Sequence, residues 1–106
     1  MLDMIHAGKI SKEKVVEKMC HAPAECFQIV DRGYLEEGQF ADIAVVDPEL
    51  KWEVNKENIL YKCGWSPFEG NTFKSRITHT FVNGHLAFEN GVLADQKNAM
   101  RLTFDR

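Results

Sequence analysis

The stretch Gly33–Asp47, GYLEEGQFADIAVVD, decides the fold of this chain. It opens with a turn bounded by glycines and continues through an apolar segment, Ala41–Val46, that ends before Pro48. This segment is rich in branched side chains and, apart from Asp42, is apolar on both faces of a period-two pattern. It therefore predicts a strand that is covered on both sides. Such a strand lies inside a sheet, so its neighbours must be found elsewhere in the chain.

The clearest neighbour is a hairpin around Asn83-Gly84, the dipeptide that a two-residue type I′ turn favours. This turn predicts four cross-strand pairs: Val82 with His85, Phe81 with Leu86, Thr80 with Ala87, and His79 with Phe88. The side chains of Phe81, Leu86, His79 and Phe88 then share one face, joined by those of Ile77 and Phe73, so the register is consistent.

Three further segments complete the strand content. Leu50–Val54 alternates between apolar and polar residues and predicts a half-exposed strand. Asn90-Gly91 predicts a second turn. The tail alternates again and predicts an extended arm docked by three apolar side chains, those of Met100, Leu102 and Phe104. A helical turn over Asn55–Tyr61, capped by Asn55, is also expected.

The first thirty residues predict short helices. Gly8 ends the first, Ser11 caps the second, and Pro23 begins the third after the poor cap Ala22. Apolar spacing predicts one stripe on the second helix, formed by Val15, Val16, Met19 and Cys20. On the third helix it places Phe27 and Val30 inward. Helices come first and strands second, which indicates an α+β fold. The strands do not close, because a strand covered on both faces needs a second layer or a helix over each face.

Composition restricts the classes of function. The chain has 106 residues, 44% hydrophobic and 27% charged, with a net charge of −3, as expected for one soluble globular domain. The basic residues are scattered, so we expect no nucleic-acid partner. No apolar run reaches membrane-spanning length, and the first residues lack a signal-peptide pattern. Three cysteines without a close-spaced pair favour a reducing cytoplasm.

Histidines and cysteines are the candidate metal ligands. A catalytic metal site needs several ligands converging on one point, but no His-x-His or His-Glu-x-x-His spacing occurs. Cys20, His21, Cys26 and Cys63 are a possible zinc set. The more ordinary interpretation places Cys20 and Cys26 on the inner faces of their helices as small hydrophobic residues.

The other histidines are His6, His79 and His85. We expect His79 to be half-buried with a bonded ring nitrogen and His85 to be solvated.

Other candidate catalytic residues also have ordinary interpretations. No Gly-x-Ser-x-Gly elbow surrounds Ser66. Asp42 could act as an acid or base, but we expect it to bind backbone amides where the strand begins. Lys74 and Arg76 could bind an anion, but we expect their side chains to lie on a solvated face of the strand. The loop Gly33–Gly38 carries two glutamates, which would repel phosphate.

The motif Gly33-x-Leu35-x-x-Gly38-x-x-Ala41-Asp42-Ile43-x-Val45-x-Asp47 resembles the segment by which enzymes of the amidohydrolase superfamily pass from their barrel into a small β-sandwich. His21-Ala22-Pro23-Ala24 resembles the Asn-Pro-Ala signature before it, with Ala22 in place of Asn. Thr80-x-Val82-Asn83-Gly84 and Glu89-Asn90-Gly91 resemble the sandwich hairpin. Within the superfamily, the loop Lys62–Gly70 and the ending Arg101–Arg106 resemble dihydroorotases.

The resemblance implies a C-terminal fragment. Residues 1–30 would be a helical remnant of a TIM-type barrel, and residues 31–106 a partial β-sandwich with a C-terminal arm. Dihydroorotases interconvert N-carbamoyl-L-aspartate and L-dihydroorotate in pyrimidine biosynthesis, using zinc held on barrel strands. None of those ligand motifs occurs here. We therefore assign no catalytic, metal or substrate-binding residue to this chain and expect it to be inactive alone. We expect the segment Ser66–Gly70 to pack against the barrel.

Two alternatives remain open. The parent could act on another cyclic amide, as hydantoinases and allantoinases do. The chain could instead be an independent β-rich binding or structural module. Because an open sandwich exposes apolar faces and strand edges, we also expect self-association, in addition to contact with the missing barrel portion.

Overall fold

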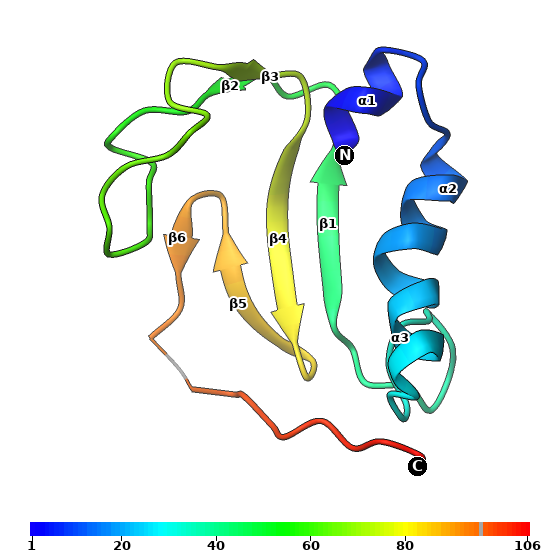
Figure 1. Cartoon of the computed structure of the whole chain (residues 1–106). Coiled ribbons are helices and arrows are strands. Elements are labelled where there is room, and N and C mark those ends of the chain that lie inside the picture. The colour runs from blue at the N-terminus through cyan, green and yellow to red at the C-terminus, as the bar shows by residue number, and fades with distance from the viewer. Residues whose placement is uncertain (96) are drawn as a thin grey trace.

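A computed structural model describes residues 1–95 and 97–106 (Figure 1). Helical segments come first and strands second, so the predicted α+β order is confirmed. The helical segments are α1 (Leu2–His6), α2 (Lys12–Val16), the π-helical turn η1 (Glu17–His21) and α3 (Ala22–Phe27). The strands are β1 (Ile43–Asp47), β2 (Trp52–Glu53), β3 (Thr72–Phe73), β4 (Arg76–Val82), β5 (His85–Glu89) and β6 (Val92–Leu93). In the described part of the chain, no helix has the length and apolar character needed to cross a membrane.

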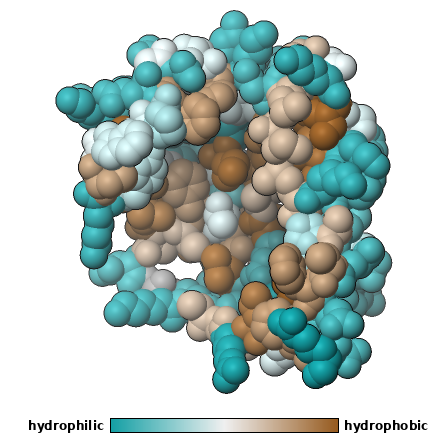
Figure 2. Space-filling model, in the orientation of Figure 1, coloured by the Kyte–Doolittle hydropathy of each residue, from teal (hydrophilic) through white to brown (hydrophobic). Residues whose placement is uncertain are grey.

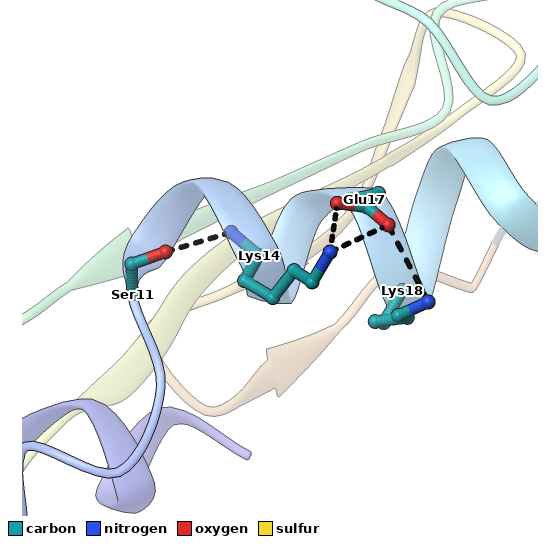
Figure 3. A network of polar contacts seen from close by, with 4 residues as sticks. All are labelled: Ser11, Lys14, Glu17 and Lys18. Carbon is teal, nitrogen blue, oxygen red and sulfur yellow. Dashed lines mark hydrogen bonds and ion pairs between the residues drawn. The ribbon is translucent and has the colours of Figure 1, made fainter.

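The elements α2, η1 and α3 form one continuous helical rod. Ser11 begins it as predicted, since its Oγ accepts a hydrogen bond from the backbone N of Lys14 at 3.1 Å. Lys14 Nζ also donates to Glu17 Oε2 at 2.7 Å, and Lys18 Nζ lies 3.4 Å from Glu17 Oε1 (Figure 3). The hydrogen bond from Lys14, helped by Lys18, lowers the pKa of the Glu17 carboxyl. This exposed network stabilises the first turns of the rod.

The third predicted helix is present as α3, with Pro23 in its first turn. The predicted cap position is wrong, because Ala22, with a φ of −59° and a ψ of −40°, lies inside the helical rod. The predicted inward face is also wrong in part. Val15 is buried as predicted. Four other residues that were expected to face inward are exposed, so the rod has only a narrow covered face; they are Val16, Met19, Cys20 and Phe27.

The main sheet is antiparallel, with strand order β1-β4-β5-β6, and β2 pairs separately with β3. The prediction that the β1 segment is an interior strand covered on both sides is wrong for the described residues. β1 is an edge strand of the main sheet, and Val45 is 40% exposed. The predicted strand over Leu50–Val54 is shortened to β2, and Val54 at its end is buried.

The Asn83-Gly84 turn is confirmed by positive φ values of 51° and 81°. The pairs nearest the turn also agree with the predicted register, but a bulge between Thr80 and Phe81 shifts the rest. Thr80 therefore pairs with Phe88 rather than Ala87, and His79 pairs with Glu89. A bulge inserts one residue and moves later side chains to the other face, so the predicted grouping of Phe88 with Phe81 is wrong.

After β5, the chain forms a short strand that was not predicted and then the predicted extended arm. The Asn90-Gly91 turn is confirmed and leads into β6, which pairs with β5. The arm docks near the end of α3 through its backbone, as Val30 N donates to Thr103 O at 3.0 Å and Asp105 N to Gln28 O at 2.9 Å. Its three apolar side chains are exposed, so the prediction that they make the docking is wrong.

The Asn55–Tyr61 segment forms a turn rather than a helix. Asn55 Oδ1 accepts hydrogen bonds from the backbone N of Glu57 and Asn58 at 3.0 and 3.1 Å. Asparagine side chains close such turns without a helix, so Asn55 acts as a cap as predicted although no helix follows it.

The chain exposes more surface than its length accounts for. Its accessible surface is 8284 Å², whereas a compact monomer of this size has about 6,000 Å². Its radius of gyration is 15.4 Å, against about 13 Å for a compact domain. Three apolar residues are buried, Val15, Ala24 and Val54, and none of the large side chains described is fully buried. The division between residues 1–30 and 31–106 stays a prediction.

Of the two glycines in the motif Gly33–Asp47, Gly33 should be the one whose substitution destabilises the fold more. It has a φ of +97°, and an added Cβ would lie 2.4 Å from Ala24 Cβ and 3.0 Å from Cys20 O. Gly33→Ala should therefore lower the free energy of unfolding by about 2–4 kcal/mol, through both backbone strain and overpacking. Gly38→Ala is the matched control, because Gly38 has a φ of +87° but open space around it. It should cost about 1 kcal/mol. Urea unfolding measures both, and equal losses would contradict the close packing.

Candidate functional site

A hollow of about 770 Å³ lies on one face of the main sheet. Its floor is formed by β4, β5 and β6, and its walls by the β2–β3 pair, α1 and η1. Figure 2 shows apolar side chains gathered in this hollowed region. The apolar residues that line it include Met19, Trp52, Phe73, Ile77, Phe88 and Leu93. A concave apolar surface of this size is a binding surface or an unfilled interface.

Polar contacts tie α1 to the rim of the hollow. Ser75 is the one buried polar residue found among the described residues, and its Oγ lies 2.9 Å from His6 Nε2. Trp52 Nε1 donates to Ser75 O at 2.8 Å, and Lys74 N donates to Asp3 Oδ1 at 3.3 Å. Serine and histidine meet here, but Ser75 Oγ also bonds Pro48 O at 3.4 Å, and the described contacts give His6 no carboxylate partner. The contact anchors α1 rather than forming a nucleophile.

A second polar cluster joins three distant segments. Arg32 forms an ion pair with Asp42 and donates from Nη2 to Asn83 Oδ1 at 2.8 Å. Asp42 Oδ1 in turn accepts from Asn83 N at 2.9 Å. The guanidinium also lies 4.2 Å from the centroid of the Phe40 ring, and the Arg32 side chain is only 10% exposed. The prediction that Asp42 binds a backbone amide where the strand begins is confirmed.

The candidate metal ligands are not brought together. No group of three histidine, cysteine, aspartate or glutamate side chains is placed to hold a metal ion within residues 1–95 and 97–106. Cys20, Cys26 and Cys63 are free and exposed, so the interpretation of Cys20 and Cys26 as buried hydrophobic residues is wrong for the described chain. His21 is used differently, since its ring stacks on Tyr34 with centroids 4.2 Å apart.

His79 and His85 behave as predicted. His79 is partly buried, with Nδ1 2.9 Å from Thr78 Oγ1 and Nε2 3.6 Å from Glu89 Oε1. His85 is exposed. Neither lies with other candidate catalytic groups in the part of the chain described.

Tyr34 is part of the same helix-facing loop as Gly33. Its hydroxyl is hydrogen-bonded to Glu25 Oε1. This hydrogen bond, together with partial desolvation and the negative charge of Glu25, raises the pKa of Tyr34. The stack on His21 and the bond to Glu25 fasten the loop to the helical rod.

The remaining candidates have local structural partners. Ser66 Oγ accepts from Phe68 N at 3.1 Å, which closes a turn. The Arg76 guanidinium lies 5.9 Å from the Trp52 ring centroid, and both residues line the hollow. The prediction that Arg76 lies on a solvated face is therefore wrong in part. The loop Lys62–Gly70 is held at its base by Gly70 N to Val54 O at 2.8 Å, while Trp65 is 61% exposed.

Sequence reasoning missed two residues that organise these clusters. Arg32 and Ser75 stand alone in the sequence, without a motif that marks them as buried. For Arg32 the one available signal was the acidic residue in the following strand segment, because a buried guanidinium needs a carboxylate. For Ser75 no sequence signal indicates the contact with His6.

Substitution of Asp42 should lower the free energy of unfolding by an amount that depends on how many of its partners are left unpaired. Asp42→Ala removes the carboxylate from a nearly buried arginine and should cost about 2 kcal/mol of unfolding free energy. Asp42→Asn keeps an oxygen for Asn83 N and should cost about 1 kcal/mol. Asp105→Ala, which removes an exposed carboxylate, is the control. Urea unfolding gives the order, and an unchanged midpoint for Asp42→Ala would refute the role of this cluster.

Comparisons with known proteins identify the family. The family model described as "Amidohydrolase family" matches residues 1–87. A dihydroorotase from Pyrococcus furiosus is 30% identical over 102 residues, which are 96% of this chain and 24% of that protein. A dihydroorotase from Endomicrobium trichonymphae is 37% identical over 87 residues, covering 82% of this chain and 21% of that protein.

Solved structures agree at the level of fold. An L-hydantoinase (dihydropyrimidinase) from Arthrobacter aurescens has a TM-score of 0.76 and 29% identity, covering 85% of this chain and 20% of that chain. A D-hydantoinase has a TM-score of 0.78 over 87% of this chain and 21% of that chain, at 24% identity, which shows likeness of fold alone. This chain spans about a quarter of the length of the curated relatives it matches. Since the family model covers most of the sequence, the chain belongs to the amidohydrolase family.

Proposed function

We propose that this chain is the C-terminal part of a dihydroorotase. The parent enzyme would interconvert N-carbamoyl-L-aspartate and L-dihydroorotate in pyrimidine biosynthesis, in the cytoplasm. The support comes from the dihydroorotases that match between 82% and 96% of the chain at 30–37% identity. The resemblance of the loop Lys62–Gly70 and the ending Arg101–Arg106 to dihydroorotases points the same way.

The excess surface is the observation that carries the proposal. The difference between 8284 Å² and about 6,000 Å² is larger than the roughly 800 Å² that one partner contributes to an ordinary interface. Part of it lies in the apolar hollow, and β1 offers an apolar sheet edge. Both features are expected of a piece whose remaining layers belong to the rest of the enzyme.

In this proposal residues 1–30 are the last helices of a TIM-type barrel, and residues 31–106 are part of a β-sandwich. The likeness of fold to the two hydantoinases supports this assignment. The strands that would pair with β1 and the layer that would cover the hollow then belong to the missing portion. The exposed Trp65 in the loop Lys62–Gly70 would pack against the barrel.

Zinc belongs to the parent in this proposal. The described residues do not fit a zinc ion, because their histidines, cysteines and carboxylates do not converge. No step of the reaction is therefore assigned to a residue of this chain. When bound to the parent, zinc would polarise the amide carbonyl and activate water.

A second candidate keeps the family and changes the cyclic amide. The L-hydantoinase structure favours this reading, because it resembles the chain at 29% identity over 85% of its length. The parent would then open hydantoin-type rings, and allantoin is a related substrate. The fold of this chain is compatible with either substrate, and the choice depends on residues of the barrel.

Activity assays distinguish these proposals. The full product of the gene that encodes this chain, loaded with zinc, should hydrolyse L-dihydroorotate with a kcat/KM at least about a hundredfold above that for hydantoin and allantoin, because a mismatched polar substrate leaves site groups unpaired. The 106-residue chain alone should show no turnover with any of the three. A preference for hydantoin would favour the second candidate, and turnover by the chain alone would refute its assignment as an inactive part.

We also propose that the chain, when produced alone, self-associates through the hollow. The alternative of an independent binding module predicts a stable monomer with a tightly bound ligand or metal. Leu93 lines the hollow and is 59% exposed, so it reports on this surface. Leu35, which is 82% exposed and does not line the hollow, offers a matched control.

Light scattering of the purified chain should show a dimer or larger species. Leu93→Glu should weaken association at least about tenfold, because burying an unpaired carboxylate costs more than 1.4 kcal/mol. Leu35→Glu should leave the association unchanged. A wild-type chain that stays monomeric at high concentration would contradict self-association, and equal effects of both variants would place the contact elsewhere.

A further inference from the structure

The chain contains two Asn-Gly dipeptides in the same structural setting. Asn83-Gly84 joins β4 to β5, and Asn90-Gly91 joins β5 to β6. Both asparagines have positive φ values, 51° and 45°, as two-residue hairpin turns of type I′ require. The same dipeptide in the same kind of turn makes them an internal matched pair, so any difference in their chemistry comes from their surroundings.

Asn83 is held at every group that could react. Its Oδ1 accepts from Arg32 Nη2 at 2.8 Å, and its Nδ2 donates to Asn98 O at 2.5 Å. Its backbone N donates to Asp42 Oδ1 at 2.9 Å. The following peptide nitrogen is also engaged, since Gly84 N donates to Ala41 O at 3.0 Å. Neither the side-chain amide nor that nitrogen can move without breaking these bonds.

Within the described part of the chain, Asn90 is held through its backbone alone. Its N donates to Thr78 O at 2.8 Å. Among residues 1–95 and 97–106, neither the Asn90 side chain nor the Gly91 N–H makes a hydrogen bond. Both residues of the turn are exposed. The strand that follows, β6, has two residues, and both are exposed, so opening this end of the sheet costs little free energy.

We propose that Asn90 is a site of spontaneous deamidation, whereas Asn83 is protected. The deprotonated peptide nitrogen of Gly91 attacks Cγ of Asn90, the Cγ–Nδ2 bond breaks, and ammonia leaves with the formation of a five-membered succinimide. Water then adds to one of the two ring carbonyls, and ring opening gives aspartate or isoaspartate. Glycine favours the attack because it has no side chain to hinder the approach.

The reaction needs the turn to open, because the pairing of β5 with β6 fixes the backbone dihedral angles of Asn90 and Gly91. For Asn90 this requires only fraying of β6 and loss of one backbone bond. For Asn83 it requires breaking the contacts with Arg32 and Asn98 as well. Two side-chain hydrogen bonds of ordinary strength are enough to separate the two rates by at least about tenfold.

The modification would alter the hollow. Phe88, Gly91 and Leu93 all line it, and they flank or include the Asn90 turn. Isoaspartate adds one carbon to the backbone and so breaks the two-residue turn geometry that sets the β5–β6 register. Each product also adds a negative charge next to Gly91, where an added Cβ would lie 3.4 Å from Arg76 Nη2.

Peptide mapping by mass spectrometry tests the proposal. The purified chain, diluted until light scattering shows a monomer, is kept in mildly alkaline buffer. Conversion of both asparagines to the aspartate mass is followed with time. A parallel sample is kept in concentrated urea. We expect Asn90 to react at least about tenfold faster than Asn83 in buffer and at a similar rate in urea, where the hydrogen bonds are lost. Equal rates in buffer, or faster reaction at Asn83, would overturn the proposal.

A pair of variants tests the cause of the protection. Arg32→Ala should raise the Asn83 rate several-fold and leave the Asn90 rate unchanged, whereas Arg101→Ala, which removes an exposed arginine, should change neither. An Asn83 rate unaffected by Arg32→Ala would overturn the protective role of the contact. If Arg32→Ala unfolds the chain, both rates rise to their values in urea, and the wild-type comparison decides the question alone.

Discussion

The pairing of β1 with β4 is the contact on which the rest of the structure depends. It joins the segment that follows the helices to the hairpin, and a bulge between Val45 and Val46 adjusts its register. The cluster of Arg32, Asp42 and Asn83 closes one end of this ladder with charge-assisted hydrogen bonds. Those bonds hold the Asn83-Gly84 turn against the strand, so sheet pairing and polar cluster support each other.

Features encoded within a few residues could be predicted from the sequence. The Ser11 cap, the two Asn-Gly turns and the role of Asp42 all follow from the chemistry of one residue and its neighbours. The bulge beside Thr80 could not be predicted, because a hairpin with or without it has the same alternating pattern. The contacts of Arg32 and Ser75 join positions far apart in the chain, and no local pattern marks them.

The errors about burial have a common physical cause under the proposed function. An apolar pattern records where side chains lie in the whole folded body. Val45, Met19 and Phe27 were predicted to be covered, and they are exposed in this chain. If a barrel and a second layer covered them, the pattern and the structure would agree. For the same reason the candidate site is a hollow and not a set of catalytic groups, since its chemistry would come from the other part.

The turn η1 has a consequence for how the loop meets the helical rod. A π-helical turn contains one residue more than an α-helical turn, and one residue corresponds to a rotation of about 100°. The side of α3 that presents Ala24 to Gly33 is therefore fixed by the number of residues between Val16 and Ala22 and not by their identity. A relative lacking that extra residue would turn Ala24 away, and its glycine would face a different helical position.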